Sequence, residues 1–515
     1  MVRTEVDWQY TAERSDRSSL SIVNGTYWPR GKMLGGTGAM NGMQYIRGNR
    51  GDYDEWEKLG NPGWGWDEVL EYFIKSEDNK DSEIVNGYDG KYHGVGGYMS
   101  IEIYKDSNSY NEVLLKATAE AGFKQLLDVN AVDHIGYAKV QYNIEGATRY
   151  TSAKAFLCSV QDRPNLHVMK NTLAVSLHYD SGNSVHGVNM IVQNQFSLRA
   201  LAKKEVIISA GSINTAQLLM LSGIGRREDL MPHKIPLRME SNVGGNLQDH
   251  VYVPLFFGFK RQISDGYGTE RALVNLFEFT LLNRSQPVFL DRIDNVLGFV
   301  NTKSKNAAFP DIQYLNMFFA KGDLNALRFF NDTGYNTLVL NSLRDHLRQQ
   351  DIAVVFVIGI DPKSRGRIRL TSANPYHHPS IMTGYFGETD DITIIRYGIR
   401  IQQDLFETNT FQNLGAELLK LNLPECYLLE YDSDDYWECY ARHMSTTLYH
   451  PVGTAKMGPE TDPEAVVDSR LKVYGIDRLR VVDASIMPTI TSGNTNAPTV
   501  MIAEKGSDLI KNDYL

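Results

Sequence analysis

Cysteine is scarce in this chain of 515 residues, which has only Cys158, Cys426 and Cys439 and no Cys-x-x-Cys spacing. A disulfide framework and a cysteine-rich zinc site both need more cysteines at closer spacing, so the sequence excludes both. A single bridge between Cys426 and Cys439 is compatible with the spacing. The more ordinary expectation is three buried thiols.

Long apolar runs and an excess of basic charge are also missing. The longest apolar stretch, residues 352–360, is shorter than the roughly 20 residues that cross a bilayer, and it predicts a buried strand instead. Lys and Arg total 52 against 62 Asp and Glu, which gives a net charge of −10. The short run predicts no membrane span, and the negative charge balance argues against nucleic acid or an anionic membrane surface as a partner.

The first residues, Met-Val-Arg-Thr-Glu-Val-Asp-Trp, lack the apolar core of a secretory signal. The sequence therefore predicts either a cytosolic chain or one that has lost its leader. Triplets of the type Asn-x-Ser/Thr at Asn24, Asn283 and Asn331 permit glycosylation in a secreted form. The compartment stays open on these observations.

A Gly-x-Gly-x-x-Gly turn, the fingerprint of dinucleotide binding, is absent from the sequence. Gly223-Ile-Gly225 lacks the third glycine and follows a helix-like run, and the glycines of residues 35–38 have the wrong spacing. What the chain does contain is ordinary globular composition, with 42% apolar and 22% charged residues. At this length we expect two joined domains with a sizeable core.

One histidine and one asparagine on loops near the C-terminus carry the most information. His450 lies in Tyr-His-Pro-Val-Gly-Thr, residues 449–454, and Asn494 lies in Thr-Ser-Gly-Asn-Thr-Asn-Ala-Pro-Thr, residues 491–499. Histidine takes and returns a proton near neutral pH, and asparagine holds an oxygen without titrating. Such a pair suits the oxidation of an alcohol.

Three glycine-rich stretches indicate close backbone approach. Residues 31–48 hold the first, in which Gly35, Gly36 and Gly38 leave the main chain open to a ligand plane or a phosphate, although tight turns use glycine more often. Residues 204–225 predict a strand, a turn at Ala210-Gly211 and a helix. The third stretch, residues 242–250, ends in Asp249-His250, which we interpret as a structural loop because sequence neighbours seldom face each other usefully.

Together these motifs resemble the glucose-methanol-choline (GMC) oxidoreductase family, nearest its animal glucose dehydrogenase-like branch. Residues 31–54 are similar to the first family signature and residues 211–225 to the second, with Ala216 where the family usually has Pro or Ser. The resemblance also includes residues 243–250, 449–454 and 481–488. It covers nearly the whole chain.

The resemblance implies an α/β FAD-binding (Rossmann-like) domain, truncated at its N-terminus, and an α+β substrate domain with an antiparallel sheet. The FAD-binding domain would comprise residues 1–103, 141–251 and 466–515, and the substrate-binding domain with its connecting segments residues 104–140 and 252–465. It further implies contacts to FAD from Gly35, Gly36, Thr37, Asn41, Gly42, Met43, Ala174, Asp483, Ala484, Thr495 and Asn496.

By the same resemblance His450 is the catalytic base and Asn494 occupies the position where relatives carry His or Asn. His450 would take the hydroxyl proton while hydride leaves for the flavin, and Asn494 would hold the developing alkoxide. The residues near the C-terminus agree with this implied FAD site. Asn496 and Pro498 predict the start of a helix, and the positive end of that helix favours reduced flavin, which is anionic. The expected partners are an alcohol or sugar and, as electron acceptor, a quinone or oxygen.

The absent glycine-rich turn leaves alternatives open, because the resemblance expects a strand–turn–helix unit that holds the FAD pyrophosphate. The chain is then either a fragment of an active flavoenzyme or a shortened, catalytically inactive paralogue that acts at most as a binding protein. A lyase that uses the same pocket is a narrower alternative. Full-length members of the family are often secreted, and no motif distinguishes an oxidase from a dehydrogenase.

Apolar patterns place the elements of the second domain. Residues 311–319 and 352–360 predict strands, and residues 390–406 predict a helix. We expect these to form an antiparallel sheet with helices on one face.

Overall fold

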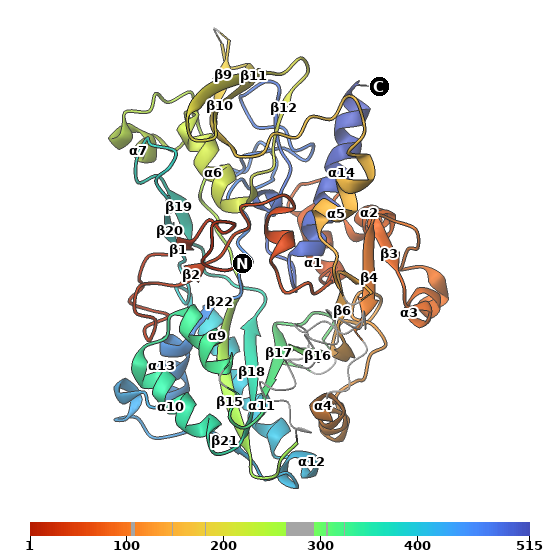
Figure 1. Cartoon of the computed structure of the whole chain (residues 1–515), viewed down its shortest axis with the longest axis vertical. Coiled ribbons are helices and arrows are strands. Elements are labelled where there is room, and N and C mark those ends of the chain that lie inside the picture. The colour runs from red at the N-terminus through yellow and green to blue at the C-terminus, as the bar shows by residue number, and fades with distance from the viewer. Residues whose placement is uncertain are drawn as a thin grey trace.

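The computed structural model describes residues 1–104, 109–146, 148–180, 182–263, 293–304, 307–323 and 325–514. Its elements gather in two regions (Figure 1). The large sheet and helices α9 to α13 lie at the bottom of the view, and α6, α14 and strands β9 to β12 lie at the top.

An antiparallel sheet in the order β21-β15-β18-β17-β16-β5, with β22 paired to β15, dominates the lower region. Its core strand β18 (Asp351–Gly359) is almost entirely buried, as its run of β-branched and aromatic residues requires. The other strands are β5 (Gly136–Lys139), β15 (Val251–Phe259), β16 (Ile293–Val300), β17 (Ile312–Phe319), β21 (Ala416–Leu418) and β22 (Thr446–Thr447).

Helices cover both faces of this sheet. On one face lies α11 (Thr389–Phe406), where the carbonyl of Gly398 accepts a hydrogen bond from the Tyr314 hydroxyl at 2.9 Å. A side chain at Gly398 would meet Val357 at 2.7 Å, so glycine permits this close packing. On the other face lies α9 (Asn325–Thr333), whose Phe329 ring stacks on Phe356 at 6.1 Å. The expectation of helices on one face only was wrong.

The upper region is built around a short parallel pair, β12 (Val206–Ile208) and β23 (Leu479–Val481). Helix α6 (Gly211–Leu221) follows β12 directly, which confirms the predicted strand, turn and helix. An antiparallel three-stranded sheet of β9 (Thr172–Tyr179), β10 (Val185–Val192) and β11 (Phe196–Leu201) packs nearby. The C-terminal helix α14 (Asn496–Tyr514) completes this region.

A buried ion network stabilises the N-terminal part of the chain. Arg47 contacts Glu77 at 2.5 Å, and the ring of His93 bridges Glu77 and Asp128, at 2.8 Å to each. Nearby elements are β1 (Tyr10–Thr11), β2 (Tyr27–Trp28), α1 (Arg50–Lys58), α2 (Trp66–Ser76), β3 (Glu77–Asn79), α3 (Ser82–Asn86), β4 (Met99–Ile103) and β6 (Gln141–Tyr142).

The remaining elements are short connections, apart from three longer helices of the lower region. Those three are α4 (Ser109–Glu120), α10 (Thr337–Leu347) and α13 (Asp434–Met444). The short ones are β7 (Ile144–Glu145), β8 (Thr148–Arg149), α5 (Ser152–Phe156), β13 (Ile224–Gly225), α7 (Arg227–Leu230), β14 (Met239–Glu240), β19 (Arg367–Arg369), β20 (Ser380–Met382) and α12 (Asn409–Gln412).

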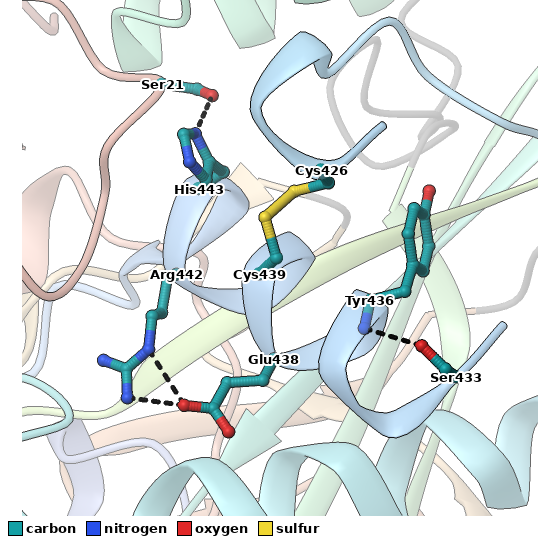
Figure 2. The surroundings of a disulfide bond; sticks show 8 residues. All are labelled: Ser21, Cys426, Ser433, Tyr436, Glu438, Cys439, Arg442 and His443. Atoms are coloured by element: carbon teal, nitrogen blue, oxygen red, sulfur yellow. Dashed lines mark hydrogen bonds and ion pairs between the residues drawn. A yellow bond between two sulfur atoms is a disulfide. The ribbon is translucent and has the colours of Figure 1, made fainter. Parts of the chain in front are cut away.

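A disulfide joins Cys426, at the end of a 3₁₀ turn (Pro424–Cys426), to Cys439 of α13 (Figure 2). His443 follows one helical turn after Cys439 and its Nδ1 atom lies 3.2 Å from the Ser21 hydroxyl. The expectation of three buried thiols was therefore wrong, since two cysteines are bonded and Cys158 is exposed. Cysteine spacing alone does not reveal which helix faces will meet.

The other predicted elements match the structure closely. The predicted strands at residues 311–319 and 352–360 are β17 and β18, and the predicted helix at residues 390–406 is α11. Among the helices of the described residues, none combines the length and the apolar character that a membrane span requires. Of the glycosylation triplets, Asn24 and Asn331 are exposed, and Asn283 lies outside the described residues.

Candidate active site

His450 and Asn494 lie side by side, although 44 residues separate them. The Asn494 amide nitrogen is 3.3 Å from His450 Nε2, and both side chains are half-buried. His450 sits on the loop after β22, between Tyr449 at φ 68° and Pro451, and Asn494 sits just before α14. The structure thus brings together the two residues that the sequence singled out.

Asp249 fixes the backbone of His450. Its Oδ1 accepts the His450 backbone N–H at 2.7 Å, and its Oδ2 accepts the hydroxyls of Thr447, at 2.6 Å, and Tyr385. Burial raises the pKa of Asp249 to about 6, although these hydrogen bonds and the charge of Arg30 oppose the rise. The carboxylate therefore holds the loop and does not face the reacting position.

The second ring nitrogen of His450 contacts another histidine. The Nδ1 atoms of His250 and His450 are 2.9 Å apart. The interpretation of Asp249-His250 as a structural loop stays a prediction, and the structure adds that both residues hold His450, one through its ring and one through its backbone.

Gln313 of β17 determines which way the Asn494 amide points. Gln313 Nε2 donates to Asn494 Oδ1 at 3.1 Å, so the Asn494 nitrogen is turned toward His450. An amide nitrogen only donates, so His450 Nε2 is the unprotonated acceptor of this contact. The proton of neutral His450 is then on Nδ1 and is donated to His250 Nδ1.

Burial keeps both imidazoles neutral. It lowers the pKa of His450 well below its usual range, and the neighbouring His250 and Arg30 act in the same direction. Burial likewise lowers the pKa of His250 to about 3, although carbonyl groups of Ile360 and Thr491 oppose the shift. A neutral His450 with an unprotonated Nε2 is equipped to accept a proton.

The glycine-rich loop of residues 35–42 lies next to α5. Gly35 and Gly36 have positive φ values of 89° and 52°, and the Ser152 hydroxyl donates to the Gly35 carbonyl at 3.1 Å. A Cβ atom at Gly36 or Gly42 would meet nothing within 4 Å, so both positions face open space. The Thr37 hydroxyl is used within the loop, where it accepts the Gly31 N–H at 3.2 Å.

Asn143 connects this loop to the start of α14. Its backbone N–H donates to the Met43 carbonyl at 2.7 Å, and its Oδ1 accepts the Asn496 amide at 3.1 Å. Asn143 Nδ2 has no hydrogen-bond partner within the described residues, although the residue is only 4% exposed. An unpaired buried donor beside open glycines and the positive end of a helix fits a polar group with anionic character.

Asn41, Met43 and Thr495 complete this part of the candidate site. Asn41 Oδ1 accepts hydrogen bonds from the Met43 N–H and from Arg149 Nη1, at 3.0 Å each. The Thr495 carbonyl accepts the Thr499 N–H at 3.1 Å in the first turn of α14. The helix begins at Asn496, as the sequence predicted, with Pro498 in its first turn.

Asp483 and Ala484 lie beside α6. Asp483 Oδ2 accepts the Gly211 N–H at 2.8 Å and the Thr215 hydroxyl at 2.6 Å, so the carboxylate ties β23 to the start of α6. The Ala484 carbonyl accepts the Gly453 N–H of the His450 loop at 3.3 Å. Ala174 lies apart from these contacts, exposed on β9 opposite Met190.

Comparison with known sequences gives consistent matches over the chain. Family models described as GMC oxidoreductase match residues 18–252 and 362–503. Glucose dehydrogenase [FAD, quinone] of Drosophila pseudoobscura pseudoobscura is 36% identical over 99% of this chain and 79% of its own length. Ecdysone oxidase of Spodoptera littoralis is 34% identical over 99% of this chain and 83% of its own length.

The fold agrees with solved structures. A crystal structure of formate oxidase superposes with a TM-score of 0.83 at 26% identity and covers 100% of this chain and 89% of its own. The matched portion includes the glycine-rich loop, the His450 loop and the large sheet, because the whole chain is covered.

Proposed function

The chain belongs to the GMC oxidoreductase family, and on that premise we propose that it oxidises the CH–OH group of an alcohol or sugar with His450 as the base. The observation that carries this proposal is the contact between His450 Nε2 and the Asn494 amide at 3.3 Å. An acceptor and a donor that lie side by side suit a hydroxyl group that must lose its proton.

FAD is the cofactor of this family, and the described residues fit it. The open glycines Gly36 and Gly42, the unpaired Asn143 amide and the start of α14 would hold the cofactor. When bound, FAD accepts the hydride that leaves the alcohol carbon.

His450 takes the hydroxyl proton on Nε2 while hydride leaves the same carbon, so that the alcohol becomes a carbonyl compound. Its Nδ1–H stays bonded to His250, which holds the ring in one orientation. Asn494, whose oxygen is occupied by Gln313, points its N–H groups at the oxygen on which negative charge develops. Acid–base assistance of this kind contributes roughly 10²- to 10⁴-fold.

The names of the relatives supply candidates for the substrate and the electron acceptor. The Drosophila relative is named for glucose, FAD and a quinone, and the Spodoptera relative for oxidation of ecdysone. We propose for this chain the chemistry that these relatives share. An alcohol carbon donates the hydride, and a quinone or oxygen accepts the electrons.

The sequence contains no Gly-x-Gly-x-x-Gly turn, which supports a finer proposal about affinity. Backbone N–H groups of such a turn are the usual ligands of the FAD pyrophosphate. We propose that the 515 residues alone hold FAD more weakly than a form extended by a strand–turn–helix unit. The non-catalytic binding protein and the lyase are the alternatives that the test below separates.

The test is the visible absorption spectrum of the purified chain after FAD has been added and the excess removed, followed by assay of dye reduction with alcohols. Retained flavin bands and alcohol-dependent dye reduction support the proposal. Retained flavin without any redox turnover favours the lyase. If neither the chain nor an extended form retains flavin, the proposal fails and a binding protein is favoured.

A further inference from the structure

We propose that Cys426, Cys439 and His443 form a zinc site once the disulfide between the two cysteines has been reduced. Among the residues that the structure describes, these are the one group of three or more His, Cys, Asp or Glu side chains whose ligand atoms converge, all within 4.8 Å of one another. The group shares no residue with the contact between His450 and Asn494. It would bind the ion whether or not the chain oxidises alcohols.

Helix α13 places two of the three ligands next to each other (Figure 2). Cys439 and His443 are four residues apart, and side chains at this spacing are neighbours on the surface of an α-helix. Cys426 comes from the 3₁₀ turn before the helix, and its Cα atom is 5.9 Å from that of Cys439. The sequence separation of 13 residues matches no zinc motif, so it is the packing of the turn on α13 that brings the ligands together.

Ser21 holds the His443 ring in an orientation that suits a metal ligand. Its hydroxyl oxygen lies 3.2 Å from His443 Nδ1, and its backbone N–H donates to the His443 carbonyl at 3.1 Å. Ser21 is only 2% exposed, so packing fixes its position. With the proton on Nδ1 donated to Ser21, the His443 Nε2 atom is left to bind an ion. Metal-binding histidines are commonly held in this way by a partner at the other ring nitrogen.

Two thiolates and one imidazole are a donor set for zinc. Zinc takes sulfur and nitrogen ligands in a tetrahedron, and a site with three protein ligands completes it with water. Calcium and magnesium need oxygen ligands, and the group contains no carboxylate. Neighbouring ligands of a tetrahedral zinc lie roughly 3.8 Å apart, given zinc–sulfur bonds of about 2.3 Å. The present spread of at most 4.8 Å therefore needs only a small adjustment.

Reduction has to precede binding, because the two sulfurs are bonded to each other. A dithiol reductant supplies two electrons and two protons to the S–S bond, which breaks into two thiols while the dithiol closes to a disulfide. Zinc then replaces both thiol protons, which leave to the solvent, because the thiolate is the form of cysteine that binds a metal.

The surface around the bridge gives access to a reductant and to an ion. Cys439 is half-buried and His443 keeps 9% exposure, whereas Cys426 is fully buried. The chain directly after Cys426 lies on the surface, with Tyr427 53% and Leu428 99% exposed. After reduction this segment can shift without opening the core, so the Cys426 sulfur can move onto the ion.

Zinc would restore the link that reduction breaks. A bound ion again joins the 3₁₀ turn to α13, and the end of this helix leads through β22 to the loop of His450. An ion that binds the folded chain and not the unfolded one stabilises the folded state. We therefore expect zinc to raise the Tm of the reduced chain and to leave the Tm of the oxidised chain unchanged.

The experiment measures zinc binding by the full chain, reduced with dithiothreitol and then freed of it by anaerobic desalting. We expect the reduced chain to bind about one equivalent of Zn²⁺ and the oxidised chain none. With Co²⁺ as the probe, the reduced chain should show thiolate-to-cobalt absorption and the visible bands of a tetrahedral ion. Absence of binding by the reduced chain, or equal binding by the oxidised chain, would overturn the proposal.

Matched variants identify the ligands. Cys158→Ser removes the exposed free cysteine and should bind Zn²⁺ as tightly as the wild type after reduction. His443→Phe leaves both cysteines in place, so its oxidised form keeps the disulfide, and we expect its reduced form to bind Zn²⁺ about a hundredfold more weakly. Equal affinity in the two variants would show that His443 is not a ligand and would overturn the site.

Ser21→Ala tests the same site through a residue that does not bind the ion. We expect its reduced form to bind Zn²⁺ about 10- to 100-fold more weakly, because the His443 ring loses the partner that orients it. The Co²⁺ spectrum should keep its tetrahedral form, since all three ligands remain. Unchanged affinity in Ser21→Ala would contradict the assignment of His443 Nε2 as the ligand atom.

Discussion

The Nδ1 atoms of His250 and His450 lie 2.9 Å apart, so one imidazole donates a hydrogen bond to the other. With Asn494 donating to His450 Nε2, the donor across this contact is His450. His250 is thus a positioning residue, since it selects the tautomer of His450 in which Nε2 carries no proton.

Substitution of His250 tests this role. We expect His250→Leu to lower kcat about 10- to 100-fold with a smaller change in KM, because the His450 ring loses the partner that fixes its tautomer. His250→Asn, which keeps an acceptor near the Nδ1 position, should recover most of the rate. Histidine ¹⁵N NMR should report a protonated Nδ1 on His450 in the wild type. If His250 had only a structural role, kcat would fall equally in His250→Leu and His250→Asn.

The pH profile of the reaction follows from the lowered pKa of His450, which burial causes first. The base gains a proton only well below pH 6.5, and protonation removes the lone pair. We therefore expect kcat/KM to stay level as pH falls from 8 to 6.5 and to decline below that range. A decline already centred above pH 6.5 in a stopped-flow or dye assay would contradict the assignment.

Gln313 should matter through Asn494 alone. Gln313→Leu frees the Asn494 amide to rotate, so we expect kcat to fall about tenfold with little loss of stability. Asn316→Leu is the matched control, because this residue is on the same strand, points to the other face and has both amide atoms unpaired within the described residues. Asn316→Leu should have the kcat of the wild type, and its unfolding free energy should be equal to or higher than that of the wild type. Equal kcat in the two variants would refute the role of Gln313.

The buried network around Glu77 should dominate the stability of the N-terminal part. Glu77→Gln leaves Arg47 and His93 without their shared partner, at a cost of about 3–5 kcal/mol in unfolding free energy. Glu145→Gln, which removes an exposed pair with Lys154, should cost less than about 1 kcal/mol. Urea denaturation of both variants measures the difference.

This network also has a defined pH dependence. Burial and the charge of Arg47 lower the pKa of His93, but the hydrogen bonds that its ring donates to Asp128 and Glu77 outweigh them and raise the pKa. A raised folded-state pKa gives stability that is fully present below pH 6.5 and is lost as pH rises through the folded pKa. The difference in unfolding free energy between the wild type and Glu77→Gln should therefore become smaller from pH 6 to pH 9. A difference that became larger would contradict the network.

The disulfide gives a further stability test. Cys439→Ser opens a bridge across a separation of 13 residues, which predicts a loss of about 3 kcal/mol. Cys158→Ser, at an exposed free cysteine, is the control and should change little. Loss of stability on treatment with reductant should appear in the wild type and be absent from Cys439→Ser.

Local patterns in the sequence predicted much of the fold. Strands β17 and β18 are apolar runs and α11 has a clear helical period, so each was visible without knowledge of its partners. The presence of helices on both faces of the sheet was not predictable this way, because α9 reaches the sheet through ring contacts between residues such as Phe329 and Phe356.

The candidate site also contains residues that the sequence predicted and residues that it did not. His450 and Asn494 stand in motifs that resemble a known family, and the structure places them in contact. Gln313 escaped notice and His250 was interpreted only as a loop residue, because their contacts join residues that are 181 and 200 positions apart in the sequence. Likewise the bond between Cys426 and Cys439 depends on how α13 packs, which spacing does not report.

The central claim is that His450 removes the hydroxyl proton during alcohol oxidation. The most direct measurement is the anaerobic rate at which an alcohol bleaches the flavin band, in FAD-loaded wild type and in His450→Ala, after rapid mixing. We expect the variant to retain flavin and to react about 10²- to 10⁴-fold more slowly. Bleaching at the wild-type rate in His450→Ala would contradict the account.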